Sequence, residues 1–206
     1  MSDDVVLYGA KTGNCLRVAI ALEELGIAHR VVPLDLRAGQ QRTPDFLALN
    51  PRGKVPVLRL HSLGAPPLVL AQSNAILLYL AQQAGGTLLP RENNASAPLA
   101  FERFFFYVTD VIAPSHTSFF LKNEGCEEGR RLMERRSLDA LLASETFLEN
   151  APFMAGQSFT LADIAAVSIV AALSSSIDWA QHPRLRRWFA DVMARPGVRR
   201  GMAAFD

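Results

Sequence analysis

Residues 50–58, NPRGKVPVL, are the stretch that decides the fold of this sequence. Pro56 stands just inside residues 55–60, which predict a β-strand. Because proline has no backbone N–H to donate, it is found at the edges and starts of strands. We expect a cis Val55–Pro56 peptide bond that turns the backbone of Val55 outward, so that its N–H and C=O can pair with an extended peptide ligand. The alternative is a plain edge strand that contains a proline.

Toward the N-terminus, the sequence predicts a βαβ unit. Residues 5–8 form a short apolar run that predicts a buried strand, and residues 29–34 are expected to form a second strand. Between them, apolar residues recur at helical spacing over residues 16–22, and Gly26 stands where a left-handed C-cap falls. Two strands joined so closely through one helix run parallel in the same sheet.

Around and beyond residue 58 the same small domain is completed. Residues 45–49 predict one short helix, and residues 68–70 predict a strand antiparallel to the third. Ser73 is a good N-cap for a helix over residues 75–83. The order β-α-β-α-β-β-α therefore occupies about the first 84 residues.

The second half of the chain predicts an all-helical domain. Residues 85–97 are polar and rich in turn formers, so we place the linker there, between domains at residues 1–84 and 98–206. Residues 127–150 predict a long amphipathic helix. Residues 164–173 are apolar on all sides, which is typical of a helix at the centre of a bundle. The fold class is thus α/β plus all-α.

Composition and charge exclude several classes of function. The 206 residues carry 21 Lys and Arg against 20 Asp and Glu, so a net charge of +1 favours neither nucleic acid nor an anionic membrane. Two cysteines are too few for a disulfide framework, and the four histidines show no metal-ligand spacing, so we expect no metal. The start of the chain does not read as a signal peptide, and no apolar run reaches the roughly 20 residues of a membrane span. We expect a soluble, cytoplasmic protein.

The turn TGNC, residues 12–15, precedes the first predicted helix. The N–H groups of a first helical turn lack partners within the helix, and the helix dipole favours an anion there. A thiol at such a position ionises more readily, and the Thr12 hydroxyl or the Asn14 carboxamide can hydrogen-bond an incoming sulfur. The alternative is that Thr12 or Asn14 only caps the helix.

The pair Gln72–Ser73 precedes the last helix of the predicted small domain. A serine hydroxyl together with the bare N–H groups of a helix N-terminus makes a carboxylate site, to which the Gln72 amide adds a donor or an acceptor. The alternative is an ordinary N-cap serine.

In this order and spacing, residues 19–27, 46–58 and 72–80 resemble the N-terminal domain of cytosolic glutathione S-transferases. In the second half, residues 160–164, TLADI, look like the capping box of the family's buried helix, and residues 183–198 are similar to its tail. The resemblance covers nearly the whole chain. It implies a thioredoxin-like N-terminal domain that binds glutathione, followed by a C-terminal helical bundle.

The resemblance also implies which residues hold glutathione. Val55, before cis-Pro56, pairs its backbone with the cysteinyl part, and Ser73 with the start of its helix holds the γ-glutamyl carboxylate. Gln41 falls where members contact the glycyl end. The full implied glutathione-binding set is Gln41, Lys54, Val55, Pro56, Gln72 and Ser73.

At the catalytic turn the resemblance leaves alternatives open. Thr12 falls where theta- and zeta-like members carry serine and omega-like members carry cysteine. A nu-like bacterial group shares the Thr12–spacer–Asn14 pattern, binds the glutathione sulfur with both residues, and typically reduces disulfides. Cys15 stands at the second position of a redox C-x-x-C motif whose first cysteine is missing. It is therefore expected to pack the helix rather than act as the nucleophile, although a mixed disulfide with glutathione is an alternative.

The implied function is that of a glutathione transferase, with glutathione as co-substrate, acting in detoxification as a homodimer. Glutathione-dependent reduction of disulfides or peroxides is the companion activity. Two alternatives remain: a non-catalytic binding or regulatory protein, and a glutathione-dependent isomerase or dehalogenase. The second substrate is expected to be a small hydrophobic electrophile or a disulfide. An aromatic cluster is a candidate wall for it, the alternative being core or dimer interface: Phe104, Phe105, Tyr107, Phe119 and Phe120.

Overall fold

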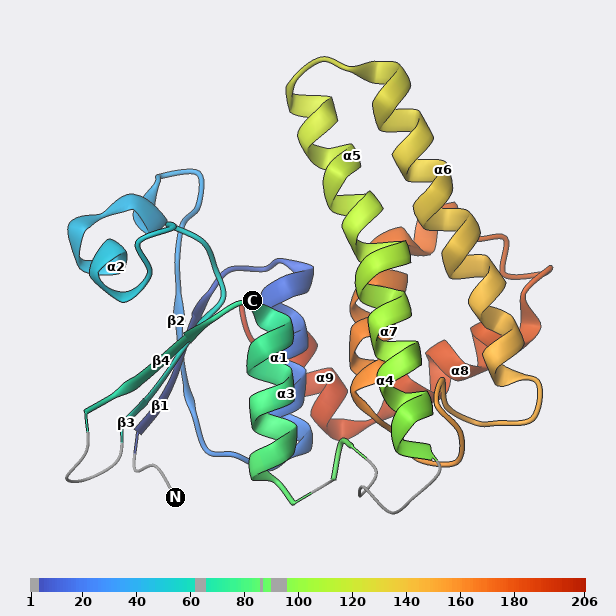
Figure 1. Cartoon of the computed structure of the whole chain (residues 1–206), viewed down its shortest axis with the longest axis horizontal. Coiled ribbons are helices and arrows are strands. Elements are labelled where there is room, and N and C mark those ends of the chain that lie inside the picture. Colours follow the sequence, from blue (N-terminus) through green and yellow to red (C-terminus); the bar gives the residue numbers. More distant parts are fainter. Residues whose placement is uncertain (1–3, 62–65, 86, 90–95) are drawn as a thin grey trace. The chain divides into compact units, whose positions relative to one another are not determined.

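A computed structural model describes residues 4–61, 66–85, 87–89 and 96–206. The chain divides into two compact units (Figure 1): Met1–Gly85 with Arg195–Asp206, and Gly86–Ala194. The predicted linker, residues 85–97, lies partly outside the described residues. Contacts group the last stretch, Arg195–Asp206, with the first unit, although it is far from that unit in the sequence.

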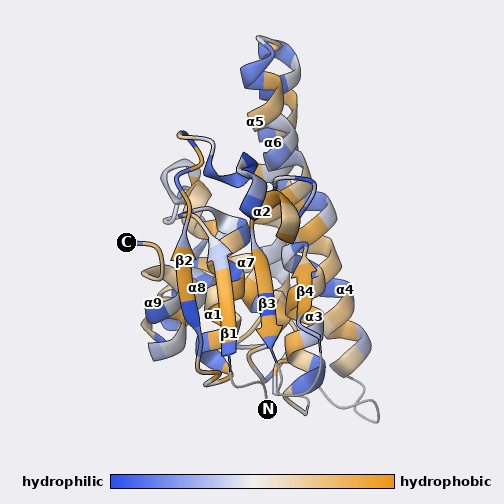
Figure 2. Cartoon of the chain, turned by 90° about the vertical axis from the view of Figure 1, so that its left-hand side faces the viewer, coloured by the Kyte–Doolittle hydropathy of each residue, from blue (hydrophilic) through white to orange (hydrophobic). Residues whose placement is uncertain are grey.

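The first unit is built on a four-stranded mixed sheet, with strand order β2-β1-β3-β4. β1 pairs parallel with β2, and antiparallel pairs join β1 to β3 and β3 to β4. Figure 2 shows the central strands as largely hydrophobic, as expected of strands inside a domain. The strands are β1 (Asp4–Gly9), β2 (Arg30–Pro33), β3 (Val57–His61) and β4 (Leu68–Ala71).

Helices complete the predicted order of the thioredoxin-like unit. α1 (Gly13–Glu24) and α3 (Ser73–Gln83) lie side by side on one face of the sheet (Figure 1). Between β2 and β3 the chain forms a 3-10 turn (Gln40–Arg42) and the short helix α2 (Pro44–Leu49). The predicted β-α-β-α-β-β-α order is confirmed.

α1 is buried on two sides because a C-terminal helix, α9 (Pro196–Met202), packs against it within the same unit. A Cβ added to Gly201 would lie 2.5 Å from the backbone N and Cα of Ile20, so the two helices touch backbone to backbone. Arg195 Nη2 lies 2.6 Å from Glu24 Oε2, which ties the start of α9 to the end of α1.

The second unit is all-helical, as predicted. α5 and α6 form an antiparallel hairpin (Figure 1). The predicted helix over 127–150 ends as an α-helix at Ala143 and continues as a 3-10 turn. The helical segments are α4 (Ser96–Phe106), a π-helical segment (Tyr107–Ile112), α5 (Ala113–Asn123), α6 (Glu127–Ala143), 3-10 turns (Ser144–Leu148 and Ser174–Ser176), α7 (Leu161–Leu173) and α8 (Pro183–Ala194).

α7 is the buried helix of this unit, and its first turn carries the predicted capping box. Asp163 is fully buried, and its carboxylate accepts bonds from Thr160 N at 2.9 Å, Met154 N at 2.9 Å and Trp188 Nε1 at 2.8 Å. Burial raises the pKa of Asp163 to about 6, and these hydrogen bonds partly offset that rise. One carboxylate thus joins α7, the preceding loop and α8.

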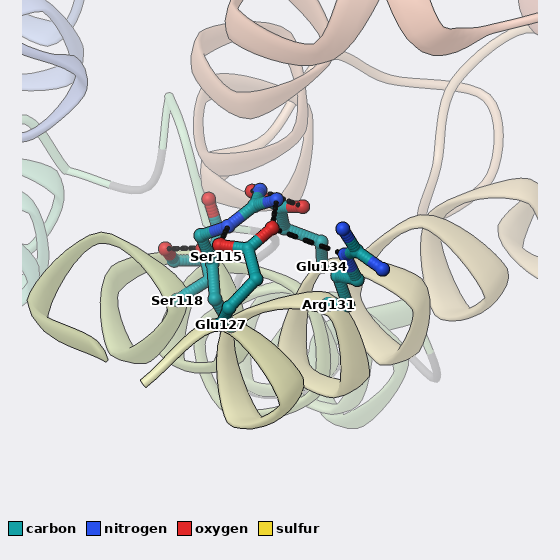
Figure 3. Close-up of polar contacts among 6 residues, drawn as sticks. Ser115, Ser118, Glu127, Arg131 and Glu134 are labelled. Atoms are coloured by element: carbon teal, nitrogen blue, oxygen red, sulfur yellow. Dashed lines mark hydrogen bonds and ion pairs between the residues drawn. The ribbon is translucent and has the colours of Figure 1, made fainter. Parts of the chain in front are cut away.

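Exposed ion pairs mark the start of α6 (Figure 3). Arg130 bridges Glu127 and Glu134, and Arg131 Nε lies 3.0 Å from Glu127 Oε1. A hydrogen bond from Arg130 holds the pKa of Glu127 at about 2, well below its usual value. Because Glu127 is fully exposed, solvent screening leaves these pairs little weight in stability.

The predicted second-substrate aromatics separate into two groups. Phe104 and Tyr107 are completely buried, and the Tyr107 hydroxyl donates to Ser144 Oγ at 2.7 Å. These two rings are core, as the alternative interpretation held. Phe105, Phe119 and Phe120 are exposed. None of the helices within the described ranges is long and apolar enough to cross a membrane.

Candidate functional site

Strand register brings all the predicted site segments to one edge of the sheet. Tyr8 of β1 pairs with Val57 of β3, and Val57 pairs with Ala71 of β4. Gly9 pairs with Pro33 at the end of β2. The turn after β1, the loop after β2, the cis-proline segment before β3 and the start of α3 after β4 therefore all leave the sheet at this edge.

The Val55–Pro56 peptide bond is cis, as predicted. Among the described residues, none forms a backbone hydrogen bond with the N–H or C=O of Val55, which lies just outside β3. The preceding loop is held from inside, because buried Asn50 donates from Nδ2 to Lys54 O at 2.7 Å and accepts from Arg52 N at 3.2 Å. The loop held by these two bonds thus presents the unpaired backbone of Val55.

At the start of α1, the Thr12 hydroxyl and the Cys15 thiol lie in different environments. Thr12 is the N-cap residue, half-buried, with an extended backbone. Its Oγ1 donates to Cys15 Sγ at 3.2 Å, and Ala10 N donates to the same sulfur at 3.4 Å. Cys15 is completely buried, and burial raises the pKa of its thiol despite these two bonds. Cys15 therefore has the environment of a packing residue.

Asn14 joins the starts of α1 and α3. The Ser73 hydroxyl donates to Asn14 Oδ1 at 3.4 Å, so the two helix N-termini meet through these side chains. Ser73 is the first residue of α3, and Gln72 occupies the capping position that the sequence assigned to Ser73. The helix begins earlier than predicted because Gln72 O already accepts from Ile76 N at 3.0 Å.

Gln72 has an unusual backbone. Its φ is 88°, in the left-handed half of conformational space. Among the described residues other than glycine, a positive φ is found at Gln72 alone. Such a conformation is costly for a residue with a side chain and is found preferentially at functional sites. The exposed Gln72 side chain is thus carried on a strained corner between β4 and α3.

Gln41 lies in the loop after β2 and contacts the cis-proline loop. A Cβ added to Gly53, whose φ is 58°, would lie 3.0 Å from Gln41 O. Gln41 Nε2 donates to Leu36 O at 3.3 Å, while its Oε1 is buried with no hydrogen-bond partner in the described part of the chain. An orphaned acceptor at this place suits a ligand N–H. Lys54 is exposed one residue further along.

Arg17 is a buried residue beside the candidate site that the sequence patterns did not single out. It is 1% exposed, donates from Nε to Gly13 O at 3.2 Å, and donates from Nη1 to Asn74 Oδ1 at 3.3 Å. It thereby connects the first turns of α1 and α3. The signal that marks it is a lone charged residue inside the apolar run CLRVAIAL, residues 15–22.

The described residues therefore form two linked groups at one sheet edge. Thr12, Asn14, Arg17 and Ser73 hold the two helix N-termini, and Gln41 packs against the loop that leads to Val55. In the described residues no group of three or more His, Cys, Asp or Glu is arranged to hold a metal ion. A surface hollow lined by Glu23, His29 and Arg200 lies at the opposite end of α1 and is separate from this edge.

Comparison with known proteins identifies the family. Residues 13–83 match the glutathione S-transferase N-terminal domain, and residues 109–196 match the glutathione S-transferase C-terminal domain. The disulfide-bond oxidoreductase YfcG of Escherichia coli is 31% identical over 93% of this chain and 91% of its own length. The glutathione S-transferase GstB of the same organism is 28% identical over 95% of this chain and 96% of its own.

The fold agrees with solved structures of that family. A glutathione transferase family member from Pseudomonas fluorescens, with two glutathione molecules bound, superposes with a TM-score of 0.85 at 26% identity over 97% of this chain and 92% of that one. The chain belongs to the glutathione S-transferase family.

Proposed function

We propose that this protein is an enzyme that binds glutathione at the sheet edge formed by the starts of α1, β3 and α3, and activates its thiol. The observation that carries the proposal is the hydrogen bond between Ser73 and Asn14, which brings two helix N-termini together beside the unpaired backbone of Val55. A tripeptide with a thiol and a carboxylate matches this arrangement. Two positive helix ends suit its thiolate and its γ-glutamyl carboxylate, and the open backbone suits its peptide part.

In this proposal each residue has a defined role. Val55 pairs with the cysteinyl backbone, Ser73 and the first turn of α3 bind the γ-glutamyl carboxylate, and Gln41 with Lys54 lies toward the glycyl end. Thr12, by turning its hydroxyl proton from Cys15 Sγ to the ligand, and Asn14, through Nδ2, donate hydrogen bonds to the sulfur. Donors aimed at a sulfur favour its thiolate, which is the nucleophile.

The thiolate then reacts in one of three ways. Attack on an electrophilic carbon forms a thioether and expels the leaving group with the bonding electron pair. Attack on a disulfide forms a mixed disulfide and releases the other half as a thiolate. Attack on a hydroperoxide breaks its O–O bond, forms the sulfenic acid of glutathione and releases an alkoxide that takes up a proton to become the alcohol. Reduction is supported by the similarity to YfcG, a disulfide-bond oxidoreductase, and transfer by the similarity to GstB. The second substrate is accordingly a small hydrophobic electrophile or a disulfide.

Activity with a panel of second substrates tests the proposal. Wild-type protein is assayed with glutathione and, in turn, a chloronitrobenzene, an organic hydroperoxide and hydroxyethyl disulfide. Turnover with at least one member is expected. Titration calorimetry with glutathione runs in parallel. Absence of binding at millimolar glutathione would establish the alternative of a non-catalytic module. Binding without turnover on this panel would favour a glutathione-dependent isomerase or dehalogenase.

We further propose a cytoplasmic homodimer that serves detoxification. The free thiols of Cys15 and Cys126 fit a reducing compartment. Exposed phenylalanines on α4 and α5 of the helical unit, among them Phe105 and Phe119, supply apolar area suited to an interface. Sedimentation at micromolar protein tests the assembly, and a single monomeric species would contradict it.

A further inference from the structure

Arg17 is a buried cation to which the described residues offer no anionic partner. Its guanidinium donates to one backbone carbonyl, that of Gly13, and to one side-chain amide, that of Asn74. Among the described residues, no Asp or Glu forms an ion pair with it. At 1% exposure the side chain also has almost no access to water.

Such a group is expensive to bury. A buried charge is normally paired or gives up its charge, because the protein interior solvates ions poorly. Burial lowers the pKa of Arg17 to about 10, which still leaves it positively charged at neutral pH. The unliganded protein therefore carries an uncompensated positive charge between α1 and α3.

The two hydrogen-bond partners do not explain this cost. Gly13 O already accepts the backbone N–H of the residue four positions later in α1, as every helical carbonyl does. Asn74 is half-buried, so water can satisfy its amide. Neither partner requires an arginine, and an apolar side chain of similar length would fill the same space without a charge.

The surroundings add to the positive potential. Arg17 lies between the N-terminal turns of α1 and α3, each with a positive helix end. Acidic groups on α1 and in the C-terminal stretch that packs against it are already paired: Asp206 with Lys11, Glu24 with Arg195, and Glu23 with Arg200. Three sources of positive potential thus converge on the start of α3, and an anion bound there would balance them.

We propose that Arg17 is the buried countercharge for the γ-glutamyl carboxylate of glutathione, which it attracts without touching it, while its bond to Asn74 holds the first turn of α3 in place. The inference rests on the proposed function, since it takes the ligand and its carboxylate site from there. Arg17 is a positioning residue in this scheme, because its buried guanidinium acts through Asn74 and through the electric field.

Titration calorimetry on the full chain tests the proposal. The variants are Arg17→Met, which removes charge and hydrogen bonds, Arg17→Gln, which removes the charge but keeps a donor, and Arg17→Lys, which keeps the charge. Arg30→Met, an exposed site on β2 in the same unit, is the matched loss of one positive charge. We expect Met and Gln at position 17 to weaken glutathione binding by about 10- to 100-fold, the range of a through-space attraction between two unit charges several ångströms apart in a partly buried site. Arg17→Lys should recover most of the lost affinity, and Arg30→Met should bind glutathione within about twofold of the wild-type affinity.

A modified ligand separates the charge effect from a structural one. Glutathione whose γ-glutamyl carboxylate is converted to an amide presents no negative charge to α3. We expect wild type and Arg17→Met to bind this analogue within about threefold of each other, because the interaction that Arg17 supports is absent. An equal loss for both ligands would overturn the proposal, as would unchanged affinity of Arg17→Met for glutathione itself.

Thermal unfolding without ligand supplies the second readout. Removing an unpaired buried charge is expected to leave the unfolding temperature of Arg17→Met equal to or above that of the wild type. A large fall with unaltered affinity would make Arg17 a purely structural residue and overturn the proposal. If Arg17→Met does not fold, Arg17→Gln carries the same comparison. If the wild-type protein itself fails to bind glutathione, the proposed function is wrong. If wild type and Arg17→Met both bind glutathione with the same affinity, only the countercharge role of Arg17 is wrong.

Discussion

At the scale of the residue, two neighbouring side chains at the start of α1 have opposite environments. Thr12 is half-buried at the N-cap, while Cys15, three residues later, is enclosed and receives two hydrogen bonds on its sulfur. A hydroxyl at the helix end can meet a ligand sulfur, whereas a thiol whose pKa is raised by burial is a poor nucleophile at neutral pH.

Replacing Thr12 tests the sulfur contact. Thr12→Val keeps the shape and removes the hydroxyl, so kcat/KM is expected to fall by about 10- to 100-fold, in line with the loss of one donor to a developing anion. Because that donor stabilises the thiolate, its loss should raise the pKa of bound glutathione and move the pH–rate profile to higher pH. Thr12→Ser is the control and should keep activity within about threefold. Intact turnover of the Thr12→Ala, Asn14→Ala double variant would remove both residues from the catalytic turn.

Cys15 should be dispensable for turnover. We expect Cys15→Ala to keep kcat/KM within about threefold, at a cost of about 1–2 kcal/mol in stability for the lost sulfur and its bonds. In wild type, iodoacetamide at pH 8 should alkylate exposed Cys126 and leave Cys15 unmodified, since a buried thiol with a raised pKa forms little thiolate. Mass spectrometry of peptides reads both sites. Rapid alkylation of Cys15 would contradict the assignment.

At the scale of the element, α7 shows how one carboxylate organises a helix. The pattern TLADI resembles the capping box of the family's buried helix, and the structure confirms that capping box. Its further partners, Met154 N and the indole of Trp188, lie on other elements and are not visible in the local pattern. The capping residue is therefore also the polar centre of the packing between α7 and α8.

Replacing Asp163 is expected to destabilise the helical unit strongly. Asp163→Ala leaves the N–H groups of Thr160, Met154 and Trp188 buried without an acceptor, which should cost about 3–5 kcal/mol. Urea unfolding measures the loss. Thr160→Ser, which keeps the capping hydroxyl, is the control and should cost under about 1 kcal/mol. A loss below about 1 kcal/mol for Asp163→Ala would refute the central role.

The same carboxylate predicts a pH dependence. Its pKa is raised from 3.8 to about 6 in the folded protein, so between these values the folded state binds the proton more tightly than the unfolded state. Its contribution to the free energy of unfolding is then largest below about pH 4 and declines as pH rises to about 6. Stability curves from pH 4 to 7 for wild type and Asp163→Asn should differ in slope over this interval and run parallel above it. Parallel curves throughout would show that the hydrogen bonds cancel the effect of burial.

At the scale of the whole molecule, the chain returns at its end to the unit in which it began. Arg195–Asp206 joins the first unit through α9, whose Gly201 contacts the backbone of Ile20 in α1. Residues 98–206 were expected to form one helical domain, because local sequence patterns do not show which unit the last residues of the chain join. The placement of α9 depends on its contact with α1, which is far away in the sequence.

Gly201→Ala tests this return of the chain. The new Cβ would meet Ile20 N and Cα at 2.5 Å, so α9 must shift away from α1, at an expected cost of about 1–3 kcal/mol. Because α1 also carries the candidate site, glutathione affinity should weaken in parallel. Ala203→Ser, at an exposed position just after α9, is the control. Unchanged thermal unfolding of Gly201→Ala would contradict the close contact.

The sequence by itself determined the order of the elements, the cis bond before Pro56 and the capping box of α7, because turn chemistry, periodicity and capping are local properties of the chain. Only the tertiary structure decided the positive φ of Gln72, the burial of Arg17 between α1 and α3, and the docking of α9. These features arise where segments distant in sequence pack together and share hydrogen bonds. Strand register and helix packing decide them, and no single stretch of residues does.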